Sequence, residues 1–290
     1  MEKTVKKKKT KRHQFLLVSL VTVLILFVGQ ISGSVICGNI FAWVRSPGWG
    51  LLVHHYLPFL FVHILLFGYL FAFERPILYS FLPAKKNGRK GNSVPLIFMG
   101  LFMGFALNFA CALSAMAAGD IKLSFASFDP FFLLVALLLV CVQSAAEELL
   151  HRGYALSALS ERYPLWVAIV LNALLFSLEH LVNPGITPFS LGMIFLAGAS
   201  FGLMAVSTDS IWFPVMVHTA WNYTQNFLLG LPNSGILSSG ALFQADSVKD
   251  GIFYDALFGL EGGLGAVIIW PLAAVVIYLF ARNRKKKLGI

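Results

Sequence analysis

The chain has 290 residues, of which 58% are hydrophobic and only 12% are charged. A soluble domain is about 45–50% apolar and about 25% charged, so the composition excludes an ordinary soluble domain and indicates a surface solvated mainly by lipid. The formal net charge of +9 does not indicate a nucleic-acid partner. The basic residues instead gather beside long apolar segments, where they set membrane topology.

Eight apolar segments follow one another along the chain, and most have about 20 residues, the length that a helix needs to cross a bilayer core. Lipid offers the backbone no hydrogen-bond partners, so each segment is predicted to be helical. The predicted fold class is therefore all-α, a polytopic transmembrane helical bundle of about eight spans. The predicted spans are residues 14–33, 51–73, 95–118, 131–157, 165–182, 189–208, 211–229 and 262–281.

Three basic clusters predict the orientation of the bundle. They lie at the N-terminus, between the second and third predicted spans, and at the C-terminus. Eight spans place all three on one side, which the positive-inside rule identifies as the cytoplasm. We expect an integral protein of a bacterial plasma membrane whose basic clusters contact anionic membrane lipids. The predicted parts are a basic cytoplasmic tail (1–13), one transmembrane domain (14–281) and a second basic cytoplasmic tail (282–290).

Three of the predicted spans contain strongly polar side chains. A charged residue near the centre of a span costs about 2.5–3.5 kcal/mol, so such residues indicate a local partner, a function or both. The clusters are Glu147, Glu148, His151 and Arg152 in the fourth span, Phe176, Glu179 and His180 in the fifth, and His218, Trp221 and Asn222 in the seventh.

Helical spacing sorts the residues of the fourth span. Glu148 and Arg152 are four residues apart and are predicted to form a charge pair on one face. Glu147 is rotated about 100° from Glu148, so it lies on a different face from the charge pair and has a different predicted role. His151 follows Glu147 by four residues, so it either hydrogen-bonds Glu147 or lies at the membrane interface.

The residue types in the three clusters suit the hydrolysis of an amide bond. This reaction needs a base that activates water, donors for the oxyanion and an acid for the leaving amine. Glu147 and His180 are the predicted pair that activates water. His218 and Asn222 share a helix face and are the predicted oxyanion donors, and the pair of Glu148 and Arg152 supports them.

The same clusters leave a metal-dependent alternative open. Glu147, His180 and His218 form a Glu/His/His set of the kind that holds catalytic zinc, although the sequence contains no HExxH motif. The cofactor expectation is therefore either none or a divalent metal such as zinc.

The three clusters together resemble a known family. The order EExxxR (Glu147, Glu148, Arg152), FxxxH (Phe176, His180) and HxxxN/D (His218, Asn222), each in its own span, is similar to the CAAX-protease and bacteriocin-processing (CPBP, or Abi) family of intramembrane proteases. The resemblance covers about residues 130–228. It implies an eight-helix intramembrane endopeptidase, glutamic or metal-dependent, in which these residues have the roles given above. It also implies a membrane-associated peptide or protein substrate, lipid-modified or modified at its C-terminus.

Two other classes of function remain open from sequence. A proton-coupled transporter also buries glutamate and histidine, although no inverted repeat is apparent in the chain. A non-catalytic membrane scaffold or immunity protein on the same fold is the second alternative. Substitution of Glu147 distinguishes the three classes, since only an enzyme loses turnover of a peptide.

Overall fold

The computed structural model describes residues 13–86 and 88–287, the last four as backbone only. Of the predicted basic tails, residues 1–12 of the first and 288–290 of the second lie outside the described residues. The last helix nevertheless continues to Lys287, so the part of the second tail that is described is helical.

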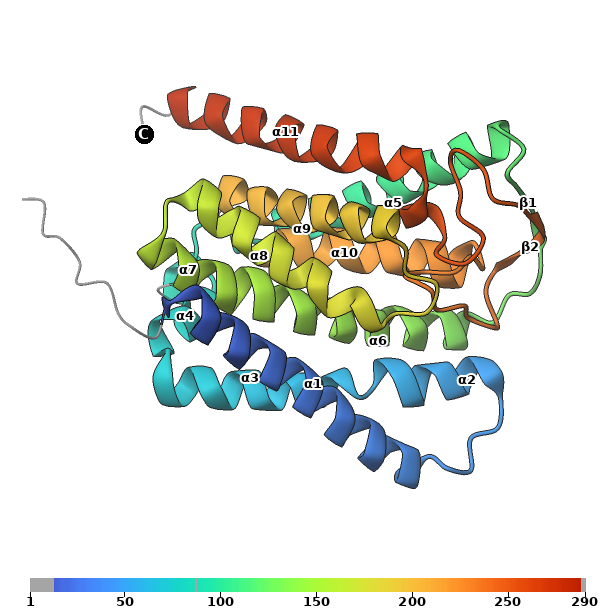
Figure 1. Ribbon diagram of the computed structural model, residues 1–290, viewed down its shortest axis with the longest axis horizontal. Coiled ribbons are helices and arrows are strands. Elements are labelled where there is room, and N and C mark those ends of the chain that lie inside the picture. Colours follow the sequence, from blue (N-terminus) through green and yellow to red (C-terminus); the bar gives the residue numbers. More distant parts are fainter. Residues whose placement is uncertain (1–12, 87, 288–290) are drawn as a thin grey trace, which may run out of the picture.

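Helices lying side by side form the molecule, which confirms the predicted helical bundle (Figure 1). Three of the short segments, η2, η4 and η6, are π-helical turns, whereas η3, η5 and η7 are 3-10 turns. The elements in chain order are α1 (Phe15–Ile40), α2 (Pro47–Leu51), η2 (Leu52–Tyr56), α3 (Phe59–Phe73), α4 (Arg75–Ser80), η3 (Ala84–Lys86), α5 (Val94–Ala117), β1 (Ile121–Phe125), α6 (Pro130–Glu148), η4 (Leu149–Ala155), α7 (Leu156–Arg162), α8 (Leu165–Glu179), η5 (His180–Val182), α9 (Pro188–Thr208), α10 (Trp212–Tyr223), η6 (Thr224–Leu228), β2 (Phe243–Val248), η7 (Leu260–Gly262) and α11 (Leu264–Lys287).

Within the described part of the chain, seven helices are long and apolar enough to cross a membrane. The chain is therefore an integral membrane protein. The remaining predicted span, 211–229, forms α10 and η6, whose α-helical part has only 12 residues. Three predicted spans ended too early: the first helix continues to Ile40, the fourth continues through η4 and α7 to Arg162, and the last continues to Lys287.

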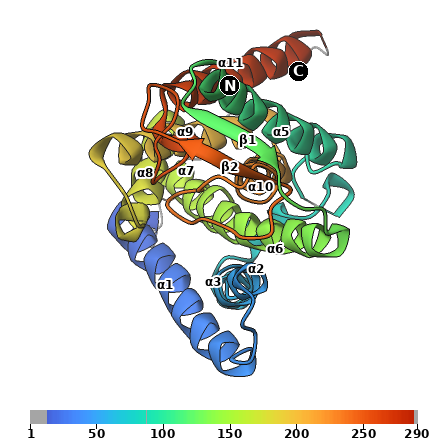
Figure 2. The same ribbon diagram turned by 90° about the vertical axis from the view of Figure 1, so that its right-hand side faces the viewer.

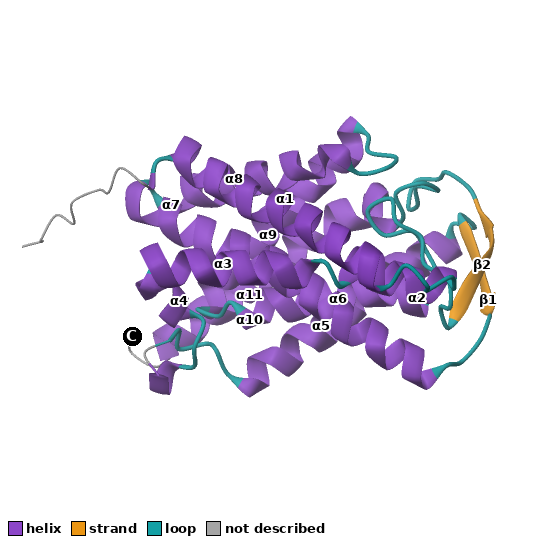
Figure 3. Ribbon diagram, turned by 90° about the horizontal axis from the view of Figure 1, so that it is seen from below, coloured by secondary structure: helices purple, strands orange, loops and turns teal. Residues whose placement is uncertain are grey.

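A small antiparallel sheet lies at one end of the bundle (Figures 2 and 3). β1 and β2 pair with Phe125 opposite Phe243 and Ile121 opposite Val248, and the register shifts between Lys122 and Leu123. The sheet joins the loop before α6 to the loop after α10. Hydropathy did not predict this pairing. α1 begins and α11 ends at the opposite end of the bundle (Figure 1), as an even number of passes requires.

Helix α10 lies inside the bundle because small residues let α5 approach it closely. A Cβ atom added at Gly100 would lie 2.6 Å from the carbonyl oxygen of Phe213, and one added at Gly104 would lie 2.3 Å from that of Val217. This spacing of two glycines, four residues apart, is typical of close helix packing in membranes. The contact fixes α10, and with it His218 and Asn222, against its neighbours.

Candidate active site

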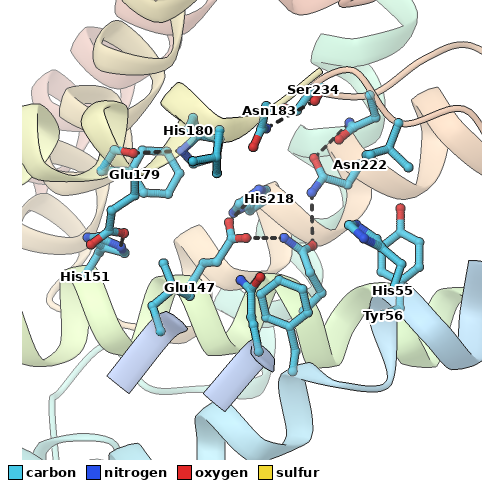
Figure 4. A pocket seen from close by; sticks show the side chains of 18 of the residues that line it. His55, Tyr56, Glu147, His151, Glu179, His180, Asn183, His218, Asn222 and Ser234 are labelled. Atoms are coloured by element: carbon cyan, nitrogen blue, oxygen red, sulfur yellow. Dashed lines mark hydrogen bonds and ion pairs between the residues drawn. The ribbon is translucent and has the colours of Figure 1, made fainter. Parts of the chain in front are cut away.

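A cavity of about 120 Å³ lies between α1, α6, α8, α10 and the loop that follows α10. All four residues predicted as catalytic, Glu147, His180, His218 and Asn222, line this cavity, and Figure 4 shows them around one space. The structure thus brings the three motifs together, while their chemical roles remain predictions. We call this space the central cavity.

Glu147 lies on α6, one turn after Gln143 and at the wall of the central cavity. The side-chain amide of Gln143 donates a hydrogen bond to Oε1 of Glu147. The other carboxylate oxygen, Oε2, is 3.8 Å from Nε2 of His218. This distance is beyond a direct hydrogen bond but suits two groups that share a water molecule.

His180 enters the central cavity from the point where α8 ends. The helix stops at Glu179 and His180 begins the 3-10 turn η5. Nδ1 of His180 is 2.7 Å from the carbonyl oxygen of Phe176, and a carbonyl can only accept, so Nδ1 carries the proton. In the neutral ring, Nε2 is therefore the nitrogen with a free lone pair.

A buried charge cluster lies behind the cavity. The predicted pair of Glu148 and Arg152 forms, with Nη1 of Arg152 2.9 Å from Oε1 of Glu148, and both side chains are fully buried. The same carboxylate oxygen is 3.0 Å from Nδ1 of His218. Arg152 also donates to the carbonyl oxygen of Gly198 and lies 4.3 Å above the ring of Phe176.

The bond between Glu148 and His218 determines what His218 can do. A carboxylate only accepts, so the proton lies on Nδ1 of His218 and Nε2 is directed toward Glu147. Sequence spacing had assigned Glu148 to Arg152 alone, because a partner 70 residues away on another helix gives no local signal. The carboxylate in fact joins α6 to α10.

The side-chain amide of Asn222 is oriented by two other amides. Its Nδ2 donates to Oε1 of Gln143 at 3.2 Å, and its Oδ1 accepts from Nδ2 of Asn233 at 3.1 Å. Gln143 thus links Asn222 to Glu147. Gln143 precedes Glu147 by four residues and so lies on the same helix face. This spacing could have predicted the contact from sequence.

His151 is placed differently from either sequence expectation. It is buried rather than interfacial, and it lines the central cavity from η4. Its Nε2 lies 2.8 Å from Oε2 of Glu179, so its ion-pair partner is Glu179 and not the predicted Glu147. Glu179 is itself buried, so the two form a second acid and histidine pair next to the predicted one.

The loop between α10 and α11 contributes residues that the sequence did not point to. Asn233, Ser234 and Ile236 line the central cavity. Glu261, in η7, accepts hydrogen bonds from the indole of Trp221 at 3.0 Å and from the backbone N–H of Ser234 at 2.9 Å. Burial raises the pKa of the Glu261 carboxyl, and these hydrogen bonds oppose the rise.

The three predicted metal ligands, Glu147, His180 and His218, line the same cavity. Over the described ranges 13–86 and 88–287, no group of three or more His, Cys, Asp or Glu side chains is arranged to hold a metal ion. In both histidines the hydrogen bond is made by Nδ1, of His180 to a carbonyl oxygen and of His218 to Glu148, and Nε2 is the nitrogen left over. Metal-binding histidines have the same arrangement, so the metal-dependent alternative stays a prediction.

Fold and site together define a polytopic membrane protein with a buried Glu/His/Asn cavity. Residues 129–224 match the model of the family described as "Type II CAAX prenyl endopeptidase Rce1-like". The match contains all three motifs and confirms the resemblance to the CPBP family over this part of the chain, which indicates a protease acting on a protein or peptide. No curated protein matches the chain.

Proposed function

We propose that the protein is an intramembrane endopeptidase that hydrolyses a peptide bond in a membrane-associated protein or peptide. The observation that carries the proposal is the convergence of Glu147, His180, His218 and Asn222, from three helices, on one cavity inside the family-matched region. A cavity of about 120 Å³ holds several water molecules, each of which needs a space of about 30 Å³.

In the proposed mechanism, Glu147 and His180 activate the attacking water. Oε2 of Glu147 and Nε2 of His180 are the acceptors left after the other atoms of these groups have found partners. Either acceptor takes the proton as the water oxygen attacks the peptide carbonyl carbon. The protonated group then delivers a proton to the leaving amine.

The developing oxyanion is stabilised by Asn222 and by His218. The amide nitrogen of Asn222 is the donor because its oxygen already accepts from Asn233. Nε2 of His218 donates only when the ring is protonated, and the carboxylates of Glu147 and Glu148 on either side favour that form electrostatically. Glu148 and Arg152 support the site by fixing the ring of His218.

The substrate is proposed to enter from the membrane as a flexible, lipid-modified or C-terminally modified segment. Three α1 residues, Leu26, Phe27 and Gln30, form one wall of the cavity. α1 packs mainly on α3 and runs at an angle across the face of the bundle (Figure 2). This side wall thus belongs to a helix with a largely lipid-exposed surface, which suits a substrate that arrives laterally.

The proposed location is a bacterial plasma membrane with both tails in the cytoplasm, in contact with membrane lipids. The basic loop between α4 and α5 lies at the same end of the bundle as the start of α1 and the end of α11 (Figure 1). The loops at the sheet end carry more acidic than basic residues. This charge asymmetry supports the orientation.

The test uses purified protein in liposomes and a pool of synthetic lipid-linked peptides whose cleavage is followed by mass spectrometry. Glu147→Gln keeps the size of the side chain and is expected to lower kcat by about 10²–10⁴-fold. Glu161→Gln, at an exposed carboxylate on α7, is the matched control and should keep full activity.

Two results would contradict the proposal. Cleavage that is equal in the wild type and Glu147→Gln would exclude the proposed base. A protein that cleaves nothing but retains its cellular phenotype after the substitution would be a scaffold or immunity protein. Metal analysis of the same preparation tests the metal-dependent alternative directly.

A further inference from the structure

A tight turn from the loop between α10 and α11 closes one side of the central cavity. Asn233 and Ile236 exchange both backbone hydrogen bonds, at 2.8 and 2.9 Å. The two residues between them have positive φ, 47° at Ser234 and 86° at Gly235, as in a type I′ turn. Positive φ is unfavourable for serine, so other contacts must hold this turn in place.

Three groups hold the turn. The carboxylate of Glu261 accepts from the backbone N–H of Ser234 at 2.9 Å and from its hydroxyl at 2.6 Å. Asn183, just after the 3-10 turn that carries His180, donates to the carbonyl oxygen of Ser234 at 3.1 Å. Gly235 lies so close to Pro184 that an added Cβ atom would be 2.0 Å from its carbonyl oxygen.

The other carboxylate oxygen of Glu261 connects the turn to α10. It accepts from the indole N–H of Trp221, which is almost fully buried and directly precedes Asn222. Ser234 and Glu261 also line a second, smaller cavity of about 30 Å³ whose wall includes His180 and His218. One carboxylate outside the three motifs therefore contacts both the turn and the helix of the proposed oxyanion donor.

Hydrogen bonds, together with the peptide bond between Asn233 and Ser234, connect Glu261 to the proposed base. Glu261 holds Ser234, and the neighbouring Asn233 donates to Oδ1 of Asn222. Asn222 in turn donates to Gln143, which donates to Glu147. Because the amide oxygens of Asn222 and Gln143 accept in this series, their amide nitrogens are directed onward, to Gln143 and to Glu147.

We propose that Glu261 is a positioning residue that, through the turn at 233–236, orients the amide of Asn222 for stabilisation of the oxyanion. This inference rests on the proposed function and extends it to a residue outside the family-matched range of 129–224. Glu261 lines the smaller cavity and not the central one, and it acts through Asn233 and Asn222.

The experiment measures kcat and KM of liposome-embedded protein on the lipid-linked peptide pool. Glu261→Gln leaves a similar shape but turns one acceptor into a donor, so kcat is expected to fall about 10–100-fold with KM changed less than about twofold. Glu261→Asp, which keeps both acceptors, is expected to recover part of the loss. Asp246→Asn, at an exposed carboxylate of the same loop, is the matched control and should have wild-type rates.

A double-variant comparison separates positioning from a general structural effect. If Glu261 acts through Asn222, then Glu261→Gln lowers kcat less than about threefold in an Asn222→Ala background. Additive effects would overturn the proposal. If Glu261→Gln fails to fold, Asn233→Ala takes its place under the same criterion, because it removes the donor to Asn222 alone.

The outcomes also separate this inference from the proposed function. Cleavage that does not depend on Glu147 overturns the proposed function and the positioning role together. Cleavage that depends on Glu147, with additive effects of Glu261→Gln and Asn222→Ala, overturns the positioning role only.

Discussion

Helices α1 and α6 are both apolar enough to span a membrane, yet they have opposite surroundings. In the most apolar window of α1, 28% of the residues are buried, whereas the corresponding window of the helix from Pro130 to Arg162 is 61% buried. α1 presents mostly large apolar side chains outward, whereas every residue from Gln143 on α6, through η4, to Leu156 at the start of α7 is buried. Apolarity therefore identifies helices in contact with lipid, and polar residues identify those in the interior.

The contrast is sharpest for α10. This helix carries two of the four proposed catalytic residues, but its α-helical part is too short to count among the apolar spans. All of its residues from Val217 to Tyr223 are buried. A helix that is surrounded by protein on all sides does not need an apolar surface toward lipid. Hydropathy therefore detects the helices around the site more readily than α10, which carries two of the site residues.

The largest expected effect concerns the buried ion pair of the interior. Arg152→Met removes the main countercharge of Glu148, and both side chains are fully buried. Removing one partner of such a pair destabilises a protein by about 3–5 kcal/mol, which is measurable as the free energy of unfolding in detergent. Arg162→Met, at the partly exposed end of the same continuous helix, should cost under about 0.5 kcal/mol.

A second substitution checks the cause of that loss. Glu148→Gln combined with Arg152→Met removes both charges and should recover at least half of the lost stability. If the double variant is less stable than Arg152→Met alone, the uncompensated charge of Glu148 is not the cause of the lost stability.

An intermediate effect is expected at the contact between α5 and α10. Gly104→Ala places a methyl group 2.3 Å from the carbonyl oxygen of Val217, and overpacking of this kind costs about 1–3 kcal/mol of unfolding free energy. Gly68→Ala on α3, where an added Cβ meets nothing within 4 Å, is the matched control and should be neutral or stabilising by up to about 1 kcal/mol. Equal stabilities in the same unfolding assay would contradict the close packing of α10.

The smallest effect tests whether the region outside the family match contributes to the interior. The hydroxyl of Tyr56, in η2, donates to Oδ1 of Asn226 at 3.3 Å, and both residues are buried. Tyr56→Phe should lower the free energy of unfolding by about 1 kcal/mol. Tyr79→Phe, at an exposed tyrosine of α4, should change it by less than a few tenths of a kcal/mol, and an equal loss at both positions would argue against the contact.

Local spacing accounts for the parts of the site that the sequence predicted. The pair of Glu148 and Arg152 follows from their separation of four residues on one helix. The convergence of Glu147, His180 and His218 was harder to predict, because the three residues lie in three different spans. The structure resolves this by ending α8 at Glu179, so that the next turn, η5, carries His180 to the cavity.

The parts that the sequence did not predict depend on contacts between distant segments. Ser234 and Glu261 lie in a long loop without helical periodicity, and only the folded chain brings them to α10. The partner of His151 is another example, since Glu179 lies 28 positions later on a different helix. The two strands are short, and their pairing closes a separation of more than 100 residues.

The π-helical turn η4 begins immediately after Glu148 and contains His151 and Arg152. A π turn accommodates one more residue than an α turn, so successive side chains in it are separated by less than the about 100° of a regular α-helix. Deleting a single residue from 149–155 would therefore restore regular winding and leave α6 and α7 close to their present orientation. The deletion would instead change the spacing of His151 and Arg152 from Glu148, so a relative with one residue fewer at this point could keep its helices in register but not the same contacts behind the cavity.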